Sequence, residues 1–492
     1  MVAYVHKGMS LPKVNIVWLK RDLRLNDHVP LQKAVAAGLP VVVLYILDSR
    51  LVDERHYAHR HWQFVRDCLV HIGKVLKSYN QHLTVVQGDS IKIFESIHRL
   101  YEVKNMYSHQ ETGLNVTYAI DKAVAKWCIS SAVEWHEEQA NGVLRGIRNR
   151  TDWIKMWYAH MHDAQMVLEI GKLKTVKPDL PSYICHYFKD LEVNSEIQRG
   201  GEQRAHHLLE SFVEERSKSY MYHISKPGES RESCSRLSPH LAWGSVSVRQ
   251  VYQAAYLAKK KGNKRNLNAF LSRLRWHDHF IQKFEQEIEM EFVPQNKAYS
   301  YIKRERNEEY VRRWESGTTG IPLVDACMRC VIKTGYLNFR MRSMLVSFLT
   351  HALLQSWEDG VHFLARQFTD FEPGIHYPQF QMQASVTGIN TIRIYNPTKQ
   401  AQEHDPHGLF IKKWVPDLID FPKEYIHEPW KMNEMERVMF GVRTTYPSPM
   451  IDVAEALKLA REELWGNKRS TAVRAGRKEV LDKHTITGRK KS

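Results

Sequence analysis

The chain has no long hydrophobic run. Of its 492 residues 43% are hydrophobic, which is ordinary for a soluble globular protein. No apolar stretch approaches the roughly 18 residues that a membrane-spanning helix requires. The best candidate, Pro40 to Leu47, is predicted to be a buried strand. Because the first residues also lack the apolar core of a secretory signal, we predict a cytoplasmic protein (nuclear in a cell with a nucleus) of two or three domains.

Cysteines are scarce as well. Six cysteines are too few for a disulfide scaffold of this size. Cys327 and Cys330 form a CxxC pair, but it lies in a helical pattern, and no cysteine follows Cys330. An iron–sulfur cluster needs four suitably placed ligands, so both thiols are predicted to be structural and we expect no metal site.

Two standard phosphate-binding sequences are missing from an N-terminal part that alternates between strands and helices. The predicted strands are Val14–Leu19, Pro40–Ile46 and Leu83–Val86, and the predicted helices are 58–79, 89–101 and 116–130. This alternation predicts a doubly wound, parallel, Rossmann-like α/β domain over residues 12–135. There is no GxGxxG after the first strand and no Walker A sequence. The strand runs instead into the basic turn Lys20 to Arg24, which is either functional or a solvated loop that bridges to another domain.

Strand signals become rare in the rest of the chain. Residues 136–200 carry few patterns and are predicted to be an interdomain linker that wraps the surface. Three- and four-residue apolar spacing then predicts an all-α domain over 201–465, with helices near 201–216, 248–260, 266–287, 322–334, 341–356 and 360–368. The segment from Asn467 holds nine Lys or Arg and two acidic residues, so 466–492 is predicted to be a disordered basic tail.

Acidic residues are fewer than basic ones. Seventy-one Lys and Arg against 55 Asp and Glu give a formal charge of +16. Such a surplus favours a polyanionic partner, above all nucleic acid, although many enzymes are basic without one.

Two irregular segments point to a binding site. Residues 393–416 contain three proline breaks, which hold non-helical backbone in one shape, and Ser235-Arg236-Leu237-Ser238-Pro239 predicts a helix start. With Ser238 as N-cap and Pro239 in the first turn, the free N–H groups suit a phosphate, and Ser235 and Arg236 add donors. An ordinary capped helix is the alternative. Further on, Arg342 and Asp370 are predicted to pair beside a ligand, with a surface salt bridge as the alternative.

Several ordered motifs bring these features together. They are Trp18 to Arg24, Ser235 to Pro239, the string Thr319-Gly-Ile-Pro-Leu-Val-Asp-Ala-Cys-Met-Arg329, Asn396-Pro397 and Trp414-Val-Pro416. Over about residues 14–465 the chain resembles the photolyase/cryptochrome family of flavoproteins. The resemblance implies an α/β antenna domain, with room for a second chromophore of folate or deazaflavin type, a linker, and a helical domain that holds FAD in a U shape.

The resemblance also implies cofactor contacts. Ser235, Arg236 and Ser238 would bind the pyrophosphate, with Tyr222 on the phosphate side. Arg342 and Asp370 would pair beside the isoalloxazine ring, and Asp370–Glu372 would lie near the ribose and adenine. The full set implied for FAD is Tyr222, Ser235, Arg236, Leu237, Ser238, Arg342, Asp370, Phe371, Glu372 and His376.

The lesion-binding positions depart from the family pattern. The set implied for DNA is Arg273, Trp276, His277, Phe339, Arg340 and Met382. Repairing members carry Glu four residues before the first pocket tryptophan, whereas Arg273 stands three before Trp276. Phe339 replaces the Asn that bonds the lesion, and Met382 replaces the second tryptophan. Members that act on (6-4) photoproducts have a histidine at the Phe339 position, so that substrate is disfavoured; the pattern resembles a less-studied bacterial branch.

The flavin side departs as well. His376 replaces the Asn that faces flavin N5, and since imidazole titrates near neutrality, flavin redox behaviour is predicted to depend on pH unless His376 points elsewhere. Of the three tryptophans of photoreduction only Trp357 remains, with Phe380 in the proximal place and Arg304 in the distal one. Weak or rerouted photoreduction is predicted, through Tyr377, Tyr395 or another tryptophan. The residues implied in the photochemistry are Arg342, Asp370, His376 and Trp357.

The favoured function is light-driven repair of cyclobutane pyrimidine dimers in DNA, by a monomer in which excited reduced FAD passes an electron to a flipped-out lesion. The charge, Trp276 and Arg340, and the lack of a long signalling extension favour it. A cryptochrome-type photoreceptor without repair is the main alternative, favoured by Arg273, Phe339 and Met382. A DNA-binding protein whose flavin is only structural is the third.

Overall fold

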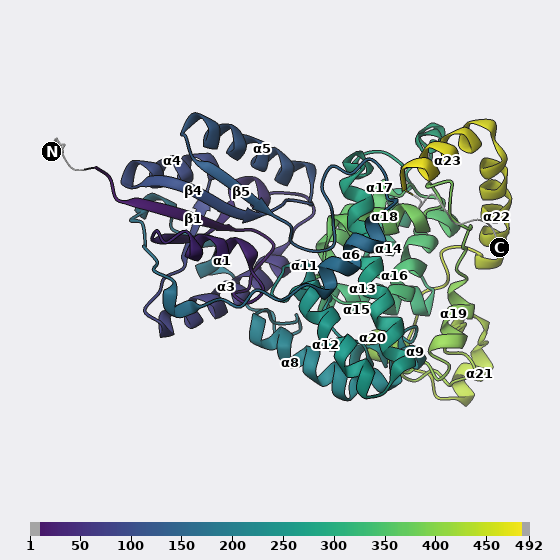
Figure 1. The fold of residues 1–492 in the computed structure, drawn as a ribbon. Helices are drawn as coiled ribbons and strands as arrows, with labels where there is room; N and C mark the ends of the chain where they lie inside the picture. Colours follow the sequence, from purple (N-terminus) through teal and green to yellow (C-terminus); the bar gives the residue numbers. More distant parts are fainter. Residues whose placement is uncertain (1–9, 485–492) are drawn as a thin grey trace.

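The computed structural model describes residues 10–484 and contains an α/β unit and a larger helical unit (Figure 1). The α/β unit, purple and blue in Figure 1, lies at one end of the molecule, and the green and yellow helical unit lies at the other. This arrangement confirms the predicted fold class, a doubly wound parallel sheet followed by an all-α domain. The domain boundaries at 135, 200 and 465 stay predictions.

A five-stranded parallel sheet in the order β3-β2-β1-β4-β5 forms the centre of the α/β unit. Its strands are β1 (Lys13–Leu19), β2 (Val41–Asp48), β3 (Thr84–Gly88), β4 (Glu102–His109) and β5 (Glu134–Glu138). The first three match the predicted strands. The sequence patterns did not indicate β4 and β5, because both carry many polar residues and β5 is an edge strand in which none of the five residues is fully buried.

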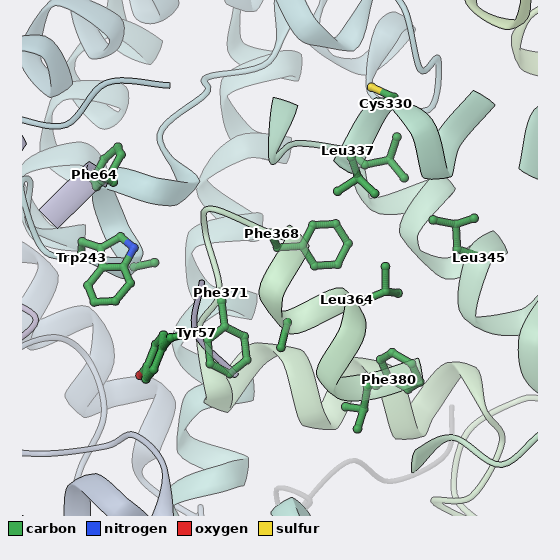
Figure 2. Close-up of a cluster of buried hydrophobic side chains, with 14 of the residues drawn as sticks. Tyr57, Phe64, Trp243, Cys330, Leu337, Leu345, Leu364, Phe368, Phe371 and Phe380 are labelled. Atoms are coloured by element: carbon green, nitrogen blue, oxygen red, sulfur yellow. The ribbon is translucent and has the colours of Figure 1, made fainter. Parts of the chain in front are cut away.

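Helices cover both faces of this sheet. They are α1 (Val29–Ala36), α2 (Ser49–Val52), α3 (His59–Ser78), α4 (Ser90–Leu100) and α5 (Asn115–Ser130). Side chains alternate between two cores: Val41, Val43 and Tyr45 face one, and Val42 and Leu44 face the other. The first core continues into the helical unit, where Tyr57 packs near Trp243 and Phe371 (Figure 2).

The connection between the units is anchored rather than loose. It contains α6 (Trp153–His162) and α7 (His186–Asp190). The indole N–H of Trp153 donates to the carbonyl of Gly142 at 3.0 Å, and that of Trp157 donates to Asp278 at 2.8 Å. Both tryptophans are buried, so this stretch, which carries few sequence patterns, packs on the helical unit through its large aromatic residues.

The helical unit contains the predicted helices and several short ones. Its helices are α8 (Glu202–Glu214), α9 (Tyr220–His223), α10 (Ser230–Ser233), α11 (Ser238–Ala242), α12 (Val248–Lys261), α13 (Lys264–Glu285), α14 (Glu308–Ser316), α15 (Pro322–Thr334), α16 (Phe339–Ser347), α17 (Glu358–Gln367), α18 (Pro373–Gln383), α19 (Pro397–His404), α20 (Leu409–Trp414), α21 (Glu434–Met439), α22 (Val453–Arg469) and α23 (Thr471–His484). A π-helical turn, Phe348–Ala352, continues α16. Along residues 10–484, none of the helices combines the length and apolar character needed to cross a bilayer.

The C-terminal segment was predicted to be disordered, and this prediction is wrong for residues 471–484. Residues 471–484 form α23, which lies beside α22 at the edge of the helical unit (Figure 1). Val473 and Val480 are buried, and His484 bonds Glu287 at 2.6 Å. Two valines seven residues apart give the helix an apolar side that the count of basic residues conceals. Residues 485–492 of the predicted tail lie outside the described part.

The basic turn after β1 bridges the two units. Arg21 donates to the carbonyl of Ala242 at 3.0 Å and to that of Phe371, and its guanidinium lies 3.4 Å from Glu372. Gly244 allows the close approach, since a Cβ there would lie 2.1 Å from the carbonyl oxygen of Arg21. Of the two interpretations of this turn, the structure supports the bridging one.

Asp22, His28 and His109 form a buried cluster at the same turn. Asp22 accepts from the Nδ1 of His109 at 2.6 Å and lies 3.0 Å from the Nε2 of His28. The other nitrogen of His28 accepts from the backbone N–H of Leu31 and caps α1. Although these three residues could coordinate a cation, His109 already bonds Asp22 and His28 lies against the same carboxylate, so the cluster holds the turn in place.

Candidate functional site

The segment Ser235 to Ser238 precedes the short helix α11. Leu237, not Ser238, is the N-cap, and no side chain caps the helix. Ser238 is the first helical residue, followed by Pro239, so the predicted capping role of Ser238 is wrong. Its hydroxyl interacts instead with the carboxylate of Asp370. Leu237 is fully buried in the core against α12 and α13, so its side chain serves packing.

Arg236 places a cation inside the helical unit. Its backbone is left-handed (φ 62°), its guanidinium lies 3.5 Å over the ring of Tyr336, and its Nη2 donates to Gln198 at 3.2 Å. Nη1 is buried without a hydrogen-bond partner. Burial lowers the pKa of Arg236, partly offset by Tyr336. A buried guanidinium with a free donor is suited to an anion such as a phosphate.

Arg231 adds a second cation beside Arg236. It lies 5.4 Å over the ring of Tyr336 and 5.9 Å over that of Trp414, and the indole nitrogen of Trp414 is buried without a partner. Among residues 10–484, neither arginine forms an ion pair with a carboxylate; their partners are carbonyl, hydroxyl, thiol and amide groups. The two guanidinium groups therefore make a positive region with no carboxylate in direct contact, and Asp370 lies near enough to Arg236 to interact with it electrostatically. Sequence patterns gave no indication of Arg231, Tyr336 or Gln198.

Arg342 and Asp370 pair as predicted, at 2.8 Å. Arg342 also donates to the carbonyl of Leu337 at 2.7 Å and lies 3.9 Å over the ring of Phe368. Burial alone would raise the pKa of Asp370, but Arg342, Ser238 and Arg236 together hold it below its ordinary value. The carboxylate is therefore ionised, and its Oδ1 is buried without a hydrogen-bond partner.

Phe371 and Glu372 face the α/β unit rather than the arginine cluster. Phe371 is buried against Tyr57 and His56. Glu372 caps α18 through the N–H of Gly374 and pairs with Arg21, while burial raises its pKa. Their position at the interface between the units was not predicted, because the partners are far away in sequence.

His376 lies on α18, and its environment differs from the prediction that its imidazole titrates near neutral pH. Burial lowers its pKa to about 3, so the imidazole is neutral at physiological pH. Its Nε2–H donates to the carbonyl of Val361 at 2.8 Å. The neutral ring then keeps Nδ1 as an acceptor, which cannot donate a hydrogen bond to a ligand.

Four aromatic rings surround His376. Phe368, Phe371, Tyr377 and Phe380 lie at ring centroid distances of 6.2, 5.3, 5.9 and 5.5 Å. In the buried cluster, Phe371 lies near Tyr57, and Phe380 lies farther from Tyr57 and Trp243 (Figure 2). Trp357 is buried, packs edge-on against Tyr377 at 6.2 Å, and has an unpartnered indole N–H.

Arg304, at the distal position, shares a hollow of about 240 Å³ with Trp357. It donates to the carbonyl of Thr350 and pairs with Glu463 at 2.9 Å. Its guanidinium thus fixes the end of the π-helical turn to α22.

The predicted lesion residues lie on three helices that pack together. Arg273, Trp276 and His277 are on α13, Phe339 and Arg340 on α16, and Met382 on α18. Trp276 and Phe339 are exposed, at 45% and 46%. Arg273 is exposed and interacts with Tyr220, and Arg340 donates to Ser225 at 3.2 Å. His277 bonds Asp278 at 2.8 Å.

Tyr222 does not join the buried cluster. It is 73% exposed, and the ammonium of Lys226 lies 4.0 Å over its ring. The neighbouring Tyr220 is buried against Phe212 and Phe270. The predicted contact of Tyr222 with a phosphate therefore has no support from its neighbours here.

The carboxyl ends of the strands form a second, smaller site. β1 has β2 on one side and β4 on the other, so the connections that follow β1 and β3 run to opposite sides of the sheet. Sheets of this kind bind ligands in the crevice that such a reversal of strand order leaves at the carboxyl ends of the strands. The crevice there is about 50 Å³ and is narrowed by Trp18, Tyr45, Tyr57 and Trp243. Lys20 and Asp121 pair within it at 2.8 Å. Ligand pockets usually measure about 300–1,000 Å³, so an aromatic ligand would need these rings to move.

Comparison with known proteins agrees with both units. Residues 15–152 match the family model of DNA photolyase, and residues 270–466 match that of the FAD-binding domain of DNA photolyase. A deoxyribodipyrimidine photo-lyase of Alkalihalophilus pseudofirmus is 26% identical, over 90% of this chain and 96% of that protein. A cryptochrome DASH of Gloeobacter violaceus is 25% identical, over 90% and 94%.

A solved structure shows the same fold. The archaeal photolyase from Sulfolobus tokodaii, determined with two FAD molecules, has a TM-score of 0.77 and 25% identity, covering 92% of this chain and 99% of that one. FAD fits the residues present: the free donor of Arg236 suits its phosphates, and the Arg342–Asp370 pair offers both a donor and a free acceptor. With a parallel α/β unit, an FAD-binding helical unit and two matching family models, the chain belongs to the photolyase/cryptochrome family of flavoproteins.

Proposed function

We propose that this protein is a light-driven DNA-repair enzyme that splits cyclobutane pyrimidine dimers. The observation that carries the proposal is the exposure of two aromatic side chains on the helical unit, Trp276 on α13 and Phe339 on α16, each close in sequence to a basic residue, Arg273 or Arg340. Exposed rings stack on unpaired bases, and neighbouring cations bind the DNA backbone. A damaged base pair, whose pairing is already weakened, costs least to flip out onto such a surface.

The buried residues would hold the cofactor. Arg236 and Arg231 bind the diphosphate through guanidinium donors, and Ser238 steadies the Asp370 carboxylate beside them. The Arg342–Asp370 pair orients the isoalloxazine ring. Light-excited reduced FAD supplies the electron that opens the cyclobutane ring and takes it back afterwards.

His376 would keep the ring environment neutral. With Nε2–H bonded to Val361, Nδ1 is free to meet a ligand, and as a neutral acceptor it can receive a hydrogen bond from an N–H group. Around it, Phe368, Phe371 and Phe380 exclude water from the reacting region.

A cryptochrome-type photoreceptor is the second candidate. The relatives include both photo-lyases and cryptochromes, and Arg273, Phe339 and Met382 remove lesion contacts that repairing members use. The basic charge weighs towards repair, because cations in place of neutral or acidic groups strengthen DNA binding.

A second, light-harvesting chromophore would need a wider site in the α/β unit than this structure shows. The Sulfolobus tokodaii photolyase was solved with two FAD molecules, and the crevice at the carboxyl ends of the strands lies where such sheets bind ligands. Its volume of about 50 Å³ means that Tyr45, Tyr57 or Trp243 must move before a chromophore enters.

The test is a repair assay on the holoprotein. Protein with chemically reduced FAD is mixed with an oligonucleotide containing one thymine dimer, and restored thymines are measured after blue light and in the dark. Restoration in light alone supports the proposal, and replacing Trp276 or Arg340 by Ala should weaken it. Bound FAD with light-dependent oligomerisation and no restored thymines would favour the photoreceptor instead.

A further inference from the structure

The rings around His376 differ sharply in how easily they are oxidised. Three of the four are phenylalanines, and only Tyr377 carries a hydroxyl group. Phenylalanine is far harder to oxidise than tyrosine. Of these four rings, which we call the His376 shell, only that of Tyr377 has a ring contact with Trp357. Of the four rings around the imidazole, Tyr377 is therefore the one that is readily oxidised.

Tyr377 has a strong hydrogen-bond partner in the other unit. Its hydroxyl lies 2.6 Å from the Nε2 of His56, and the Nδ1 of that histidine lies 2.7 Å from Glu54. His56 and Glu54 belong to the loop between α2 and α3, so this chain of hydrogen bonds crosses between the units. Tyr377 and His56 are fully buried, whereas the Glu54 side chain is 20% exposed. The chain thus runs from the interior towards solvent.

The protons in this chain can be assigned from the carboxylate. The hydrogen bond from His56 lowers the pKa of Glu54, so Glu54 is ionised and Nδ1 of His56 carries the ring proton. The hydroxyl of Tyr377, 2.6 Å away, is then the donor to Nε2 of His56. His362 is a poorer partner, because its Nε2 lies 3.4 Å from the same hydroxyl.

Burial makes a proton acceptor necessary. It raises the pKa of Tyr377, so the phenol stays protonated at physiological pH. Loss of an electron from a protonated phenol leaves a cation that is strongly disfavoured in an apolar interior. Transfer of the proton to a base at the same time removes that cost, and 2.6 Å is a suitable distance for such a transfer.

We propose that Tyr377, His56 and Glu54 form a proton-coupled redox relay that feeds electrons to the flavin during photoreduction. Tyr377 gives one electron to light-excited oxidised FAD, directly or through Trp357, and its proton to Nε2 of His56. The O–H bond breaks, an N–H bond forms, and a neutral tyrosyl radical remains. Glu54 neutralises the imidazolium. A thiol in solution then returns one electron and releases its own proton, and His56 gives the tyrosine proton back.

This inference rests on the proposed function, because the oxidant is the FAD of the helical unit. It also provides a route for the photoreduction that is predicted to be rerouted, because Phe380 and Arg304 stand where the resemblance places tryptophans. A purely structural hydrogen bond between the units is the competing interpretation, so the test needs readouts that such a bond would not move.

The experiment uses FAD-loaded protein, blue light and a thiol. Wild-type protein should show a transient tyrosyl radical by electron paramagnetic resonance, with its spectrum narrowed by ring-deuterated tyrosine, and slower photoreduction in D₂O. Tyr377→Phe and His56→Gln should each reduce the photoreduction yield at least roughly tenfold, since Gln keeps a hydrogen bond but cannot take the proton. Tyr252→Phe is the matched control, because Tyr252 is also buried and bonded to a histidine, His162, at 3.2 Å, yet lies outside the shell.

Protein without FAD gives an independent readout. The Nδ1 proton of His56, held at 2.7 Å by Glu54, should give a strongly downfield NMR signal that Glu54→Gln removes and Tyr377→Phe shifts. Wild-type protein that photoreduces without a tyrosyl signal or a solvent isotope effect would overturn the relay, and that result needs no variant to fold. Failure to bind FAD would instead refute the proposed function, so the two failures are distinguishable.

Discussion

Asp370 carries its charge in the interior because several donors face it. Arg342 lies 2.8 Å away, and Ser238 and Arg236 add to the field that holds its pKa low. Asp370→Asn would leave Arg342 and Arg236 without an anion nearby. It would also remove the charged acceptor, Oδ1, that is proposed to meet the cofactor. A hydrogen bond to a charged group contributes about 1.5–3 kcal/mol, so FAD affinity should fall by at least roughly tenfold.

Fluorescence titration of FAD into cofactor-free protein measures this change. Glu308→Gln is the control: it removes an exposed partner of Arg306, and such pairs contribute little. Equal FAD affinity in Asp370→Asn and wild-type protein would show that the pair lies away from the cofactor.

His376 should contribute no pH dependence near neutrality. Since burial lowers its pKa to about 3, the ring is neutral between about pH 6 and pH 8. The midpoint potential of bound FAD in His376→Asn should differ from that of wild-type protein by a constant offset over this range. A difference that changes with pH would mean that His376 titrates there and that its pKa is not depressed.

For single residues, the sequence predicted a role in the site only where the residue belongs to one of the ordered motifs. Arg342, Asp370, Arg236 and Ser238 were found that way, although the capping role of Ser238 was wrong. The contact of Tyr377 with His56 joins positions 321 residues apart, and no periodicity or spacing in a single chain marks such a pair.

Among the secondary-structure elements, α18 packs on α13, and this packing positions His376 and Tyr377. Gly374, in the first turn of α18, makes it possible, because a Cβ there would lie 2.7 Å from the Cα of Ile281 on α13. Gly374→Ala should therefore push the two helices apart and destabilise the protein by about 1–3 kcal/mol. Urea unfolding, followed by far-ultraviolet circular dichroism and by release of FAD, measures the loss.

At Gly466, in α22, a change from glycine to alanine is expected to raise stability rather than lower it. A Cβ there meets nothing within 4 Å, so Gly466→Ala should stabilise its helix by up to about 1 kcal/mol. If Gly374→Ala raised stability as Gly466→Ala is expected to do, the close contact of α18 with α13 would be refuted.

Element prediction succeeded where apolar spacing was strong. The buried strands β1 to β3 and helices such as α12, α13 and α15 follow from their patterns. Polar β4 and β5 were missed, and so was α23, whose apolar side is narrow. Tertiary packing decides such segments, because a polar strand is held by its neighbours rather than by its own residues.

Across the whole molecule, buried neutral histidines predict acid sensitivity. Burial lowers the pKa of His61 and of His240 to about 3, well below the ordinary value of 6.5. Below that ordinary value the unfolded chain binds a proton that the folded protein refuses. Stability should therefore fall as pH drops, by up to about 2 kcal/mol for each such histidine between pH 6.5 and pH 5.

The slope of unfolding free energy against pH tests this statement. His240 bonds Ser245 at 2.7 Å, a contact that Gln can keep, so His240→Gln should lower the slope by about 1.4 kcal/mol per pH unit. Identical slopes in variant and wild-type protein would mean that His240 is protonated in the folded state as readily as in the unfolded one.

The central claim is that this molecule converts absorbed light into repair of DNA. The action spectrum of thymine restoration, measured on dimer-containing oligonucleotide with the FAD chemically reduced, tests it most directly. The account predicts that repair per incident photon follows the absorption spectrum of protein-bound reduced FAD and vanishes in the dark. Fully FAD-loaded protein that binds the oligonucleotide but restores no thymine at any wavelength would contradict it.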